Sequence, residues 1–390
     1  MKKTTFAAAI AAAALSACGG GDNNNGSASA SGAGGGNASA GSGATTGGTG
    51  ASTSASAIAL VSAPGAGAAG SFTATGDVAT DAVSYLNNLR VQAGLPALAI
   101  QSGVAQAAQA HSSWEQLNNT ISHYETSGTA GYTGYSPSDR VNLHYTASAV
   151  GEVTAGLAGA FTSSTEAAQA LFDAPFHRAV MLYDSANAGA GSASTASLTQ
   201  YSTLTIDFAD YKQFLADNQL VAWPYSGMTG ANTSWFANES PNPMPAQYQS
   251  TTVGYPVTLT GGGNASFSNV SFTIKDASGN NVPCQEVDSS NNSEAGREAM
   301  CVPFAPLAVN TTYTVAVSGT LANTSFAATP FSLSWQFTTA ATANVPVGAP
   351  TTGAPTTTTS TSTTSTTSTT STGGAQAFRQ ATPGRAVILN

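Results

Sequence analysis

The chain has 390 residues, only 7% of them charged, and Gly, Ala, Ser, Thr and Asn dominate the remainder. Ten Lys and Arg residues against nineteen Asp and Glu residues give a formal net charge of −9. This balance leaves no basic stripe for nucleic-acid binding, and an anionic membrane surface would repel the chain. Long stretches are too poor in apolar residues to form a packed core.

Residues 1–18 have the features of an export signal. Lys2 and Lys3 form a short basic region, residues 4–15 form an Ala-rich apolar core, and small residues lead to Cys18. The apolar core is too short to span a bilayer. The sequence Leu-Ser-Ala-Cys at 15–18 resembles the lipobox of bacterial lipoproteins, which implies lipidation of Cys18. The following Gly19 implies the outer membrane, because inner-membrane retention in enterobacteria uses an aspartate there. The alternative is an ordinary cleaved signal.

Residues 19–76 contain one charged residue, Asp22, among Gly, Ser, Ala and Thr. Such a segment cannot bury enough apolar area to offset the entropy of ordering, so we expect a disordered linker. By coil scaling it would reach on the order of 40 Å, enough to hold a folded domain away from a membrane.

Two amphipathic helices are predicted next. The apolar residues of the first recur at a period of 3.6 from about Asp77, and Gly94 followed by Pro96 predicts its end. A second helix is predicted over residues 102–118. It carries His111 on its apolar stripe, where a histidine is more often a satisfied core residue than a ligand.

The segment 163–182 places Glu166 and His177 eleven residues apart on a helix-turn-helix pattern. Ser163 and Glu166 have the spacing of a capping box, which predicts a helix start. Asp173 and Pro175 predict the N-cap and first turn of a second short helix, with His177 facing inward.

Two strands are predicted in the same region. Glu152 stands between two valines in a β-compatible segment, so its burial requires a partner. Residues 202–208 alternate as a strand with one buried face.

Together these segments resemble the bacterial branch of the CAP superfamily, which includes cysteine-rich secretory proteins, antigen-five venom proteins and plant pathogenesis-related proteins. The resemblance covers about residues 77–215. It implies a three-layer α-β-α sandwich with a central groove. It is carried by these sequences in order: LNNLRVQAGLPAL at 86–98, AQAAQAHSSW at 105–114, ISH at 121–123, SDR at 138–140, VGEV at 150–153, TEAAQALFDAPFHRAVML at 165–182, and a Gly-Ala-Gly turn at 189–191.

The resemblance also implies a groove quartet of His123, Glu152, Glu166 and His177. Two departures stand out. Val153 replaces the asparagine that usually follows the glutamate of the Gly-Glu-Asn motif, and Phe176 replaces the glycine that commonly precedes the second histidine. Both change the polarity of the groove, so a family activity does not transfer directly.

Such a quartet allows several chemistries. His123 and His177, with carboxylates nearby, could bind Zn²⁺ or another divalent cation that activates water. Without a metal, the carboxylates could fix the histidine tautomers. Alternatively, Glu166 only caps its helix, Glu152 supports the sheet and His177 packs in the core.

From about residue 219 the pattern changes to short strands separated by turns, which predicts a β-sandwich. Residues 219–340 resemble bacterial Ig-like modules. With Cys18 assigned to lipid, Cys284 and Cys301 remain as an even pair, which predicts a disulfide in an exported protein. Residues 341–390 are predicted as a disordered Thr- and Ser-rich tail, whose apolar end at 387–389 has no assigned target.

The sequence therefore predicts an α+β fold: a CAP sandwich followed by an all-β Ig-like sandwich, joined by disordered linkers. We expect a monomeric cell-envelope lipoprotein, facing the periplasm or cell surface, whose groove binds a small hydrophobic, lipid-like or sterol-like ligand or a partner segment. The alternatives are a divalent-metal-dependent hydrolase acting on peptide or envelope material, and a surface adhesion or display protein. Binding is preferred over catalysis.

Overall fold

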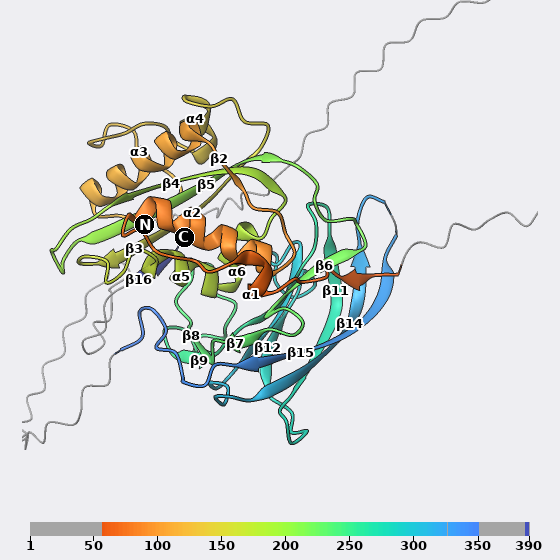
Figure 1. Cartoon of the computed structure of the whole chain (residues 1–390). Coiled ribbons are helices and arrows are strands. Elements are labelled where there is room, and N and C mark those ends of the chain that lie inside the picture. The colour runs from red at the N-terminus through yellow and green to blue at the C-terminus, as the bar shows by residue number, and fades with distance from the viewer. Residues whose placement is uncertain (1–56, 326, 351–386, 390) are drawn as a thin grey trace, which may run out of the picture. The chain divides into compact units, whose positions relative to one another are not determined.

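The computed structural model describes residues 57–325, 327–350 and 387–389 (Figure 1). The predicted signal, the lipobox with Cys18, most of the first linker and most of the tail lie outside the described residues. No helix among the described residues is long and apolar enough to cross a membrane.

The first two long helices follow the sequence prediction. Helix α2 (Val78–Gln92) begins after Asp77, whose carboxylate accepts a hydrogen bond of 2.8 Å from the amide of Thr80. Helix α3 (Ser102–Asn118) has the predicted bounds. Both helices bury apolar residues against a sheet.

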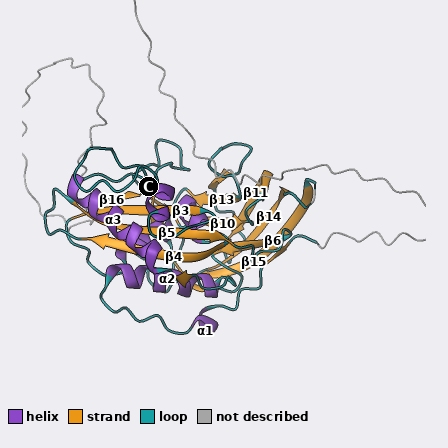
Figure 2. Ribbon diagram, turned by 90° about the horizontal axis from the view of Figure 1, so that it is seen from above, coloured by secondary structure: helices purple, strands orange, loops and turns teal. Residues whose placement is uncertain are grey.

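That sheet has five strands in the order β16-β3-β5-β4-β2. Its strands are β2 (Ala99–Ile100), β3 (Val150–Ala158), β4 (Ser185–Ala193), β5 (Tyr201–Tyr211) and β16 (Val387–Leu389). Helices α3 and α4 (Pro137–Asn142) cover one face, and helices α2, α5 (Glu166–Asp173) and α6 (Pro175–Met181) cover the other (Figures 1 and 2). The predicted α-β-α layers are therefore present.

Strand β3 shows how one strand serves both faces, because its side chains alternate between them. Val153, Ala155 and Leu157 enter the main hydrophobic core with α2 and α5. Glu152 and Thr154 face the opposite side, where Thr154 bonds to Glu115 of α3. The polar residues of β3 are thereby collected beneath α3.

The predicted turn at residues 189–191 is wrong, since these residues lie inside β4. Helix α3 passes directly over them. A Cβ atom at Gly189 would lie 2.1 Å from the amide nitrogen of Ala105, and one at Gly191 would lie 2.1 Å from the Cα of Gln109. The glycines permit close contact between helix and strand, rather than a chain reversal.

Of the two helix starts predicted for residues 163–182, the second is confirmed, because α6 begins at Pro175, but both predicted N-caps are wrong. Helix α5 begins at Glu166 with Thr165 as N-cap, and the Glu166 carboxylate accepts a bond of 2.6 Å from the amide of Thr162. Ala174 is the N-cap of α6. Asp173 does not cap that helix because its carboxylate accepts a hydrogen bond of 2.7 Å from the hydroxyl of Tyr255, a distant residue of the β region.

The predicted first linker ends earlier than expected. Strand β1 (Ala59–Leu60) and helix α1 (Ala66–Ala69) both fall inside residues 19–76. Strand β1 pairs in parallel with β6 (Gln219–Trp223), and Leu60 and Val61 pack against the core. Local composition could not reveal this pairing, because the partner strand lies far along the chain.

After β5 the described chain forms strands. One sheet has the order β1-β6-β10-β13-β12, a second has the order β11-β14-β15-β7, and β8 and β9 form a separate pair. The strands are β7 (Thr229–Ala231), β8 (Ser234–Phe236), β9 (Thr252–Gly254), β10 (Val257–Thr260), β11 (Ser266–Lys275), β12 (Cys284–Val287), β13 (Glu298–Pro303), β14 (Thr312–Ala322) and β15 (Thr329–Thr339). A disulfide between Cys284 and Cys301 joins β12 to β13, as predicted. The Ig-like assignment stays a prediction.

The predicted disordered tail is wrong at its far end. Residues 387–389 form β16, which pairs antiparallel with β3 along the outer edge of the CAP-like sheet. Leu389 is buried at 1% exposure, so its apolar side chain provides a reason for the pairing.

Candidate functional site

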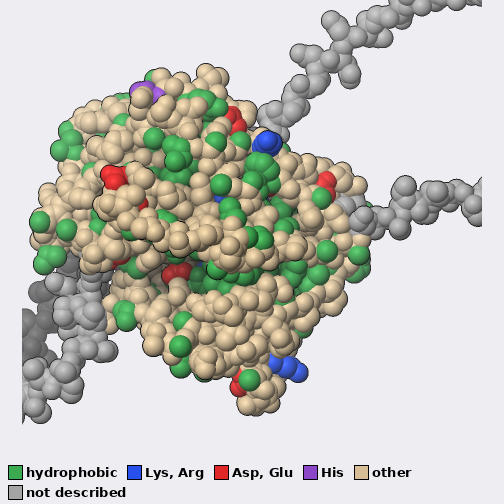
Figure 3. Space-filling view, in the orientation of Figure 1, with side chains coloured by type: hydrophobic (Ala, Val, Ile, Leu, Met, Phe, Trp, Pro, Cys, Tyr) green, Lys and Arg blue, Asp and Glu red, His purple; other side chains and the backbone are tan. Residues whose placement is uncertain are grey.

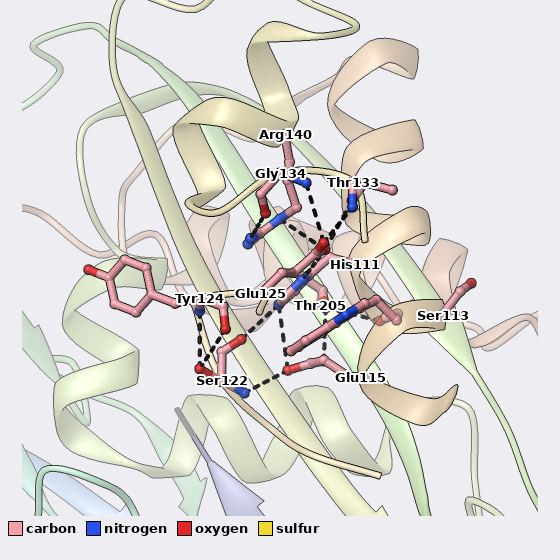
Figure 4. Close-up of polar contacts among 12 residues, drawn as sticks. His111, Ser113, Glu115, Ser122, Tyr124, Glu125, Thr133, Gly134, Arg140 and Thr205 are labelled. Carbon is pink, nitrogen blue, oxygen red and sulfur yellow. Dashed lines mark hydrogen bonds and ion pairs between the residues drawn. The ribbon is translucent and has the colours of Figure 1, made fainter. Parts of the chain in front are cut away.

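A buried polar cluster lies between α3 and the sheet, and His111 is at its centre (Figure 4). The Nδ1 atom of His111 lies 2.9 Å from Oε1 of Glu125, and its Nε2 atom lies 2.9 Å from the carbonyl oxygen of Ser122. Both ring nitrogens therefore have partners. The expectation that His111 is a satisfied core residue is confirmed.

Arg140 and Glu152 connect this cluster to the surface. The guanidinium of Arg140 donates to Oε2 of Glu152 over 2.5 Å and to the carbonyl oxygen of His123 over 3.1 Å. The other carboxylate oxygen of Glu152 lies 2.8 Å from Nδ1 of His123. Glu152 thus has the partners that its burial requires. His123 is held at its side chain by Glu152 and at its carbonyl oxygen by Arg140.

Exposure distinguishes the two members of this pair. The side chain of Glu152 is 1% exposed, whereas that of His123 is 36% exposed. The buried carboxylate therefore fixes an imidazole ring that is partly exposed to solvent. No hydrogen bond to Nε2 occurs among the residues that the structure describes.

The surroundings shift the pKa values of the carboxyl groups in this cluster in opposite directions. Burial alone would raise the pKa of Glu152, but the hydrogen bond with His123 and the charges of His111 and Arg140 lower it below the usual value. Burial raises the pKa of Glu115 well above its ordinary value. Burial does the same for Asp207, assisted by the nearby charge of Glu152.

Asp207 lies opposite Glu152 in the β3–β5 register. Asp207 is buried, and its interaction with the Glu152 carboxyl favours a proton on Asp207 over a second negative charge at this position.

His177 has a partner outside the predicted quartet. Its Nδ1 atom lies 2.9 Å from Oε2 of Glu239, and the amide of Phe176 donates to the same oxygen over 3.2 Å. Glu239 follows β8 in the β region and is buried. The CAP-like resemblance ends before this residue, so sequence reasoning had no signal for it beyond a lone acidic residue in a chain with few charges.

The structure therefore brings His123 and Glu152 into direct contact, pairs His177 with Glu239, and places the Glu166 carboxylate on the backbone of Thr162. Across the described ranges, no group of three or more His, Cys, Asp or Glu side chains is placed to hold a metal ion. The role of the four residues as one groove quartet stays a prediction.

A cavity of about 480 Å³ lies on the sheet near the outer edge of β3, where that strand pairs with β16. It is lined by Asn119, Thr120, Ile121, Ala158, Leu198, Thr199, Tyr201 and Ile388. Its volume falls within the range of roughly 300–1,000 Å³ that is typical of small-molecule sites. The lining contains both apolar and polar residues, and none of them is charged. Charged side chains are also sparse on the face of the molecule that Figure 3 shows.

The segment from Asn119 to His123 joins the cavity to the polar cluster. Its first three residues line the cavity, and its last residue contacts Glu152. On β3, Glu152 and Ala158 share one face, since they are an even number of residues apart. The cavity and the exposed imidazole therefore belong to one continuous side of the sheet.

Residues 83–208 match the family model described as CAP, cysteine-rich secretory protein family. This region is a CAP domain. The match includes His123, Glu152, Glu166 and His177, but not Glu239. The resemblance inferred from the sequence motifs is thereby confirmed for this part of the chain.

Two solved structures show limited similarity. An extracellular protein containing a SCP domain from Bacillus anthracis str. Ames is 22% identical, with 34% of this chain and 40% of that chain covered and a TM-score of 0.28. CopC from Methylosinus trichosporium OB3b is 20% identical, with 32% of this chain and 96% of that chain covered and a TM-score of 0.21. No curated protein matches the chain.

Proposed function

We propose that the CAP domain binds an elongated amphipathic ligand, such as a lipid-like molecule, with its apolar part in the cavity and its polar end at His123. The observation that carries this proposal is the shared side of β3. The segment 119–123 supplies the connection between the two parts: its first three residues line the cavity, and His123 at its end contacts Glu152.

The lining of the cavity supports a ligand with an apolar part. Ile121, Leu198 and Ile388 supply aliphatic surface, and Tyr201 adds an aromatic ring. Leu198 is 78% exposed, so a ligand that covers it would remove apolar surface from water. The threonine side chains in the lining can bond a polar group without requiring a charge.

The polar end of the ligand would meet His123. The contact between Nδ1 and the carboxylate of Glu152 favours the tautomer with the proton on Nδ1, which leaves Nε2 as a hydrogen-bond acceptor. A hydroxyl or a protonated acid is the complementary group.

We also propose that the chain is exported and anchored by lipid at Cys18, in agreement with the lipobox-like sequence. The disulfide between Cys284 and Cys301 supports export, since such bonds persist mainly in oxidising compartments. Growth with a labelled fatty acid tests the anchor. We expect label on the wild-type chain and none on Cys18→Ala, whereas an unlabelled wild-type chain would refute lipidation.

Ligand binding can be tested by titrating cis-parinaric acid, a fluorescent fatty acid, into the full chain. Leu198→Asp places a charge at the exposed rim of the cavity and should weaken binding at least tenfold. Leu143→Asp is the matched control, because Leu143 is also exposed, at 64%, but does not line the cavity. Equal affinities of the two variants, or no binding by the wild-type chain, would contradict the proposal.

A further inference from the structure

Strand β16 covers the outer edge of β3 and is itself covered by another segment. Val387, Ile388 and Leu389 pair with Leu157, Gly156 and Ala155, in that order. On the opposite side of β16, the carbonyl oxygen of Leu389 accepts a hydrogen bond of 3.3 Å from the amide of Ser240. The three-residue strand therefore lies between the CAP sheet and the segment that carries Glu239.

The side chains of β16 are used on both faces of the sheet. Leu389 is buried at 1% exposure and joins the main hydrophobic core. Ile388 pairs with Gly156, and so shares its face, and it forms part of the cavity wall. A side chain at position 156 would collide with Ile121, since a Cβ atom there would lie 2.4 Å from it. Ile388 fills the adjacent position from the neighbouring strand.

Without β16, the outer edge of β3 would present unpaired amide and carbonyl groups. Such an edge binds an extended peptide by adding a strand: the backbone bonds give affinity, and pockets for alternate side chains give selectivity. At this edge, the hydrophobic core accepts one aliphatic side chain, that of Leu389, and the cavity wall accepts the preceding one, that of Ile388. Both positions are occupied by residues of the same chain.

We propose that the outer edge of β3 is an acceptor site for an extended apolar peptide, and that residues 387–389 occupy it as an exchangeable internal ligand. Only three residues make the strand pairing, and the whole segment 351–386 separates them in sequence from the β region. Residues 387–389 stay paired with β3 because their covalent connection to the chain gives them a high local concentration at this edge. A peptide that displaces them also removes Ile388 from the cavity wall. This proposal concerns a peptide site and does not require that the cavity bind lipid.

A labelled peptide with the sequence of residues 382–390, TPGRAVILN, tests the acceptor site. It is titrated by fluorescence anisotropy into a chain that ends at residue 386 and into the full chain. We expect binding to the shortened chain and at least tenfold weaker binding to the full chain, where the site is already occupied. A peptide with Ile388→Asp and Leu389→Asp is the control and should not bind. Equal affinity for both chains, equal binding of the control peptide, or no binding to a folded shortened chain would overturn the proposal.

A locked full-length chain tests the same site without truncation. Ala155 and Leu389 lie opposite each other in the strand register, so Ala155→Cys with Leu389→Cys should form a cross-strand disulfide. We expect a cross-link within one chain, loss of peptide binding while it is oxidised, and recovery on reduction, with the wild-type chain treated alike. A cross-link between two chains, or peptide binding that persists in the locked chain, would overturn the proposal.

Discussion

The Nδ1 atom of His177 and the Oε2 atom of Glu239 lie 2.9 Å apart, which joins α6 of the CAP domain to the segment after β8. Both side chains are buried, at 5% and 0% exposure. Burial raises the pKa of Glu239 well above its usual value, although the hydrogen bonds from the backbone and the charge of Arg178 oppose the shift. We interpret the contact as a fixed connection between the CAP domain and the β region.

Glu239→Gln should be tolerated, because the amide oxygen can still accept the bonds from His177 and Phe176. Glu239→Ala should lower the free energy of unfolding by about 1–3 kcal/mol, since it leaves buried donors without an acceptor. Urea denaturation of both variants measures the difference. Equal losses in the two variants would show that an amide does not replace the carboxyl group in these hydrogen bonds.

Asp173 should make stability depend on pH. Burial raises its pKa from 3.8 to about 6, although Tyr255, Arg178 and Asn232 oppose the shift. Between about pH 4 and pH 6 the unfolded chain has lost this proton while the folded chain retains it, so stability falls as pH rises. Because asparagine does not titrate, Asp173→Asn should abolish this fall in the free energy of unfolding, which amounts to up to about 3 kcal/mol. Urea denaturation at pH 4 and pH 7 measures the free energy of unfolding of both chains. We expect that of the variant to rise relative to that of the wild type at pH 7, whereas the same difference at both pH values would contradict the raised pKa of Asp173.

The close contact between α3 and β4 predicts unequal costs for two glycine substitutions. Gly191→Ala would place a Cβ atom 2.1 Å from the backbone of Gln109 and should cost about 3 kcal/mol. Gly151→Ala is the control, because its Cβ atom would meet only side-chain atoms at 3.8 Å or more. Thermal unfolding compares the two. Similar unfolding temperatures would show that the helix does not lie so close to the strand.

Loss of the disulfide should destabilise the β region. The two cysteines are separated by 17 positions, and closing a loop of that size contributes roughly 3 kcal/mol in the chain-entropy treatment. We expect Cys284→Ser with Cys301→Ser to lower the urea midpoint, and added reductant to have no further effect on this variant. An unchanged midpoint would show that the bond adds no stability.

Local features of the structure were predictable from the sequence. Apolar periodicity predicted α2 and α3, because each helix buries one stripe against the sheet. The valines around Glu152 indicated a buried acid that needs a partner, and the family resemblance placed His123 beside it. In both cases the signal lies within one segment or within a motif set carried by the CAP domain.

Relationships across long sequence distances were not predictable. His177 and Glu239 are separated by 62 positions, and Glu239 lies outside the CAP motifs. Strand β16 is too short to show a period, and its partner β3 lies more than two hundred residues earlier. The glycines of β4 were mistaken for a turn because the sequence does not show which helix passes over them.

Nitrogen NMR of the histidine rings tests the proposed binding site most directly, because the chain has only four histidines. The full chain is labelled with ¹⁵N-histidine, and a fatty acid is added. We predict that the Nε2 signal of His123 shifts on saturation, while exposed His144, which does not line the cavity, does not respond. Binding that leaves the His123 signal unchanged would contradict the account, as would the absence of any binding.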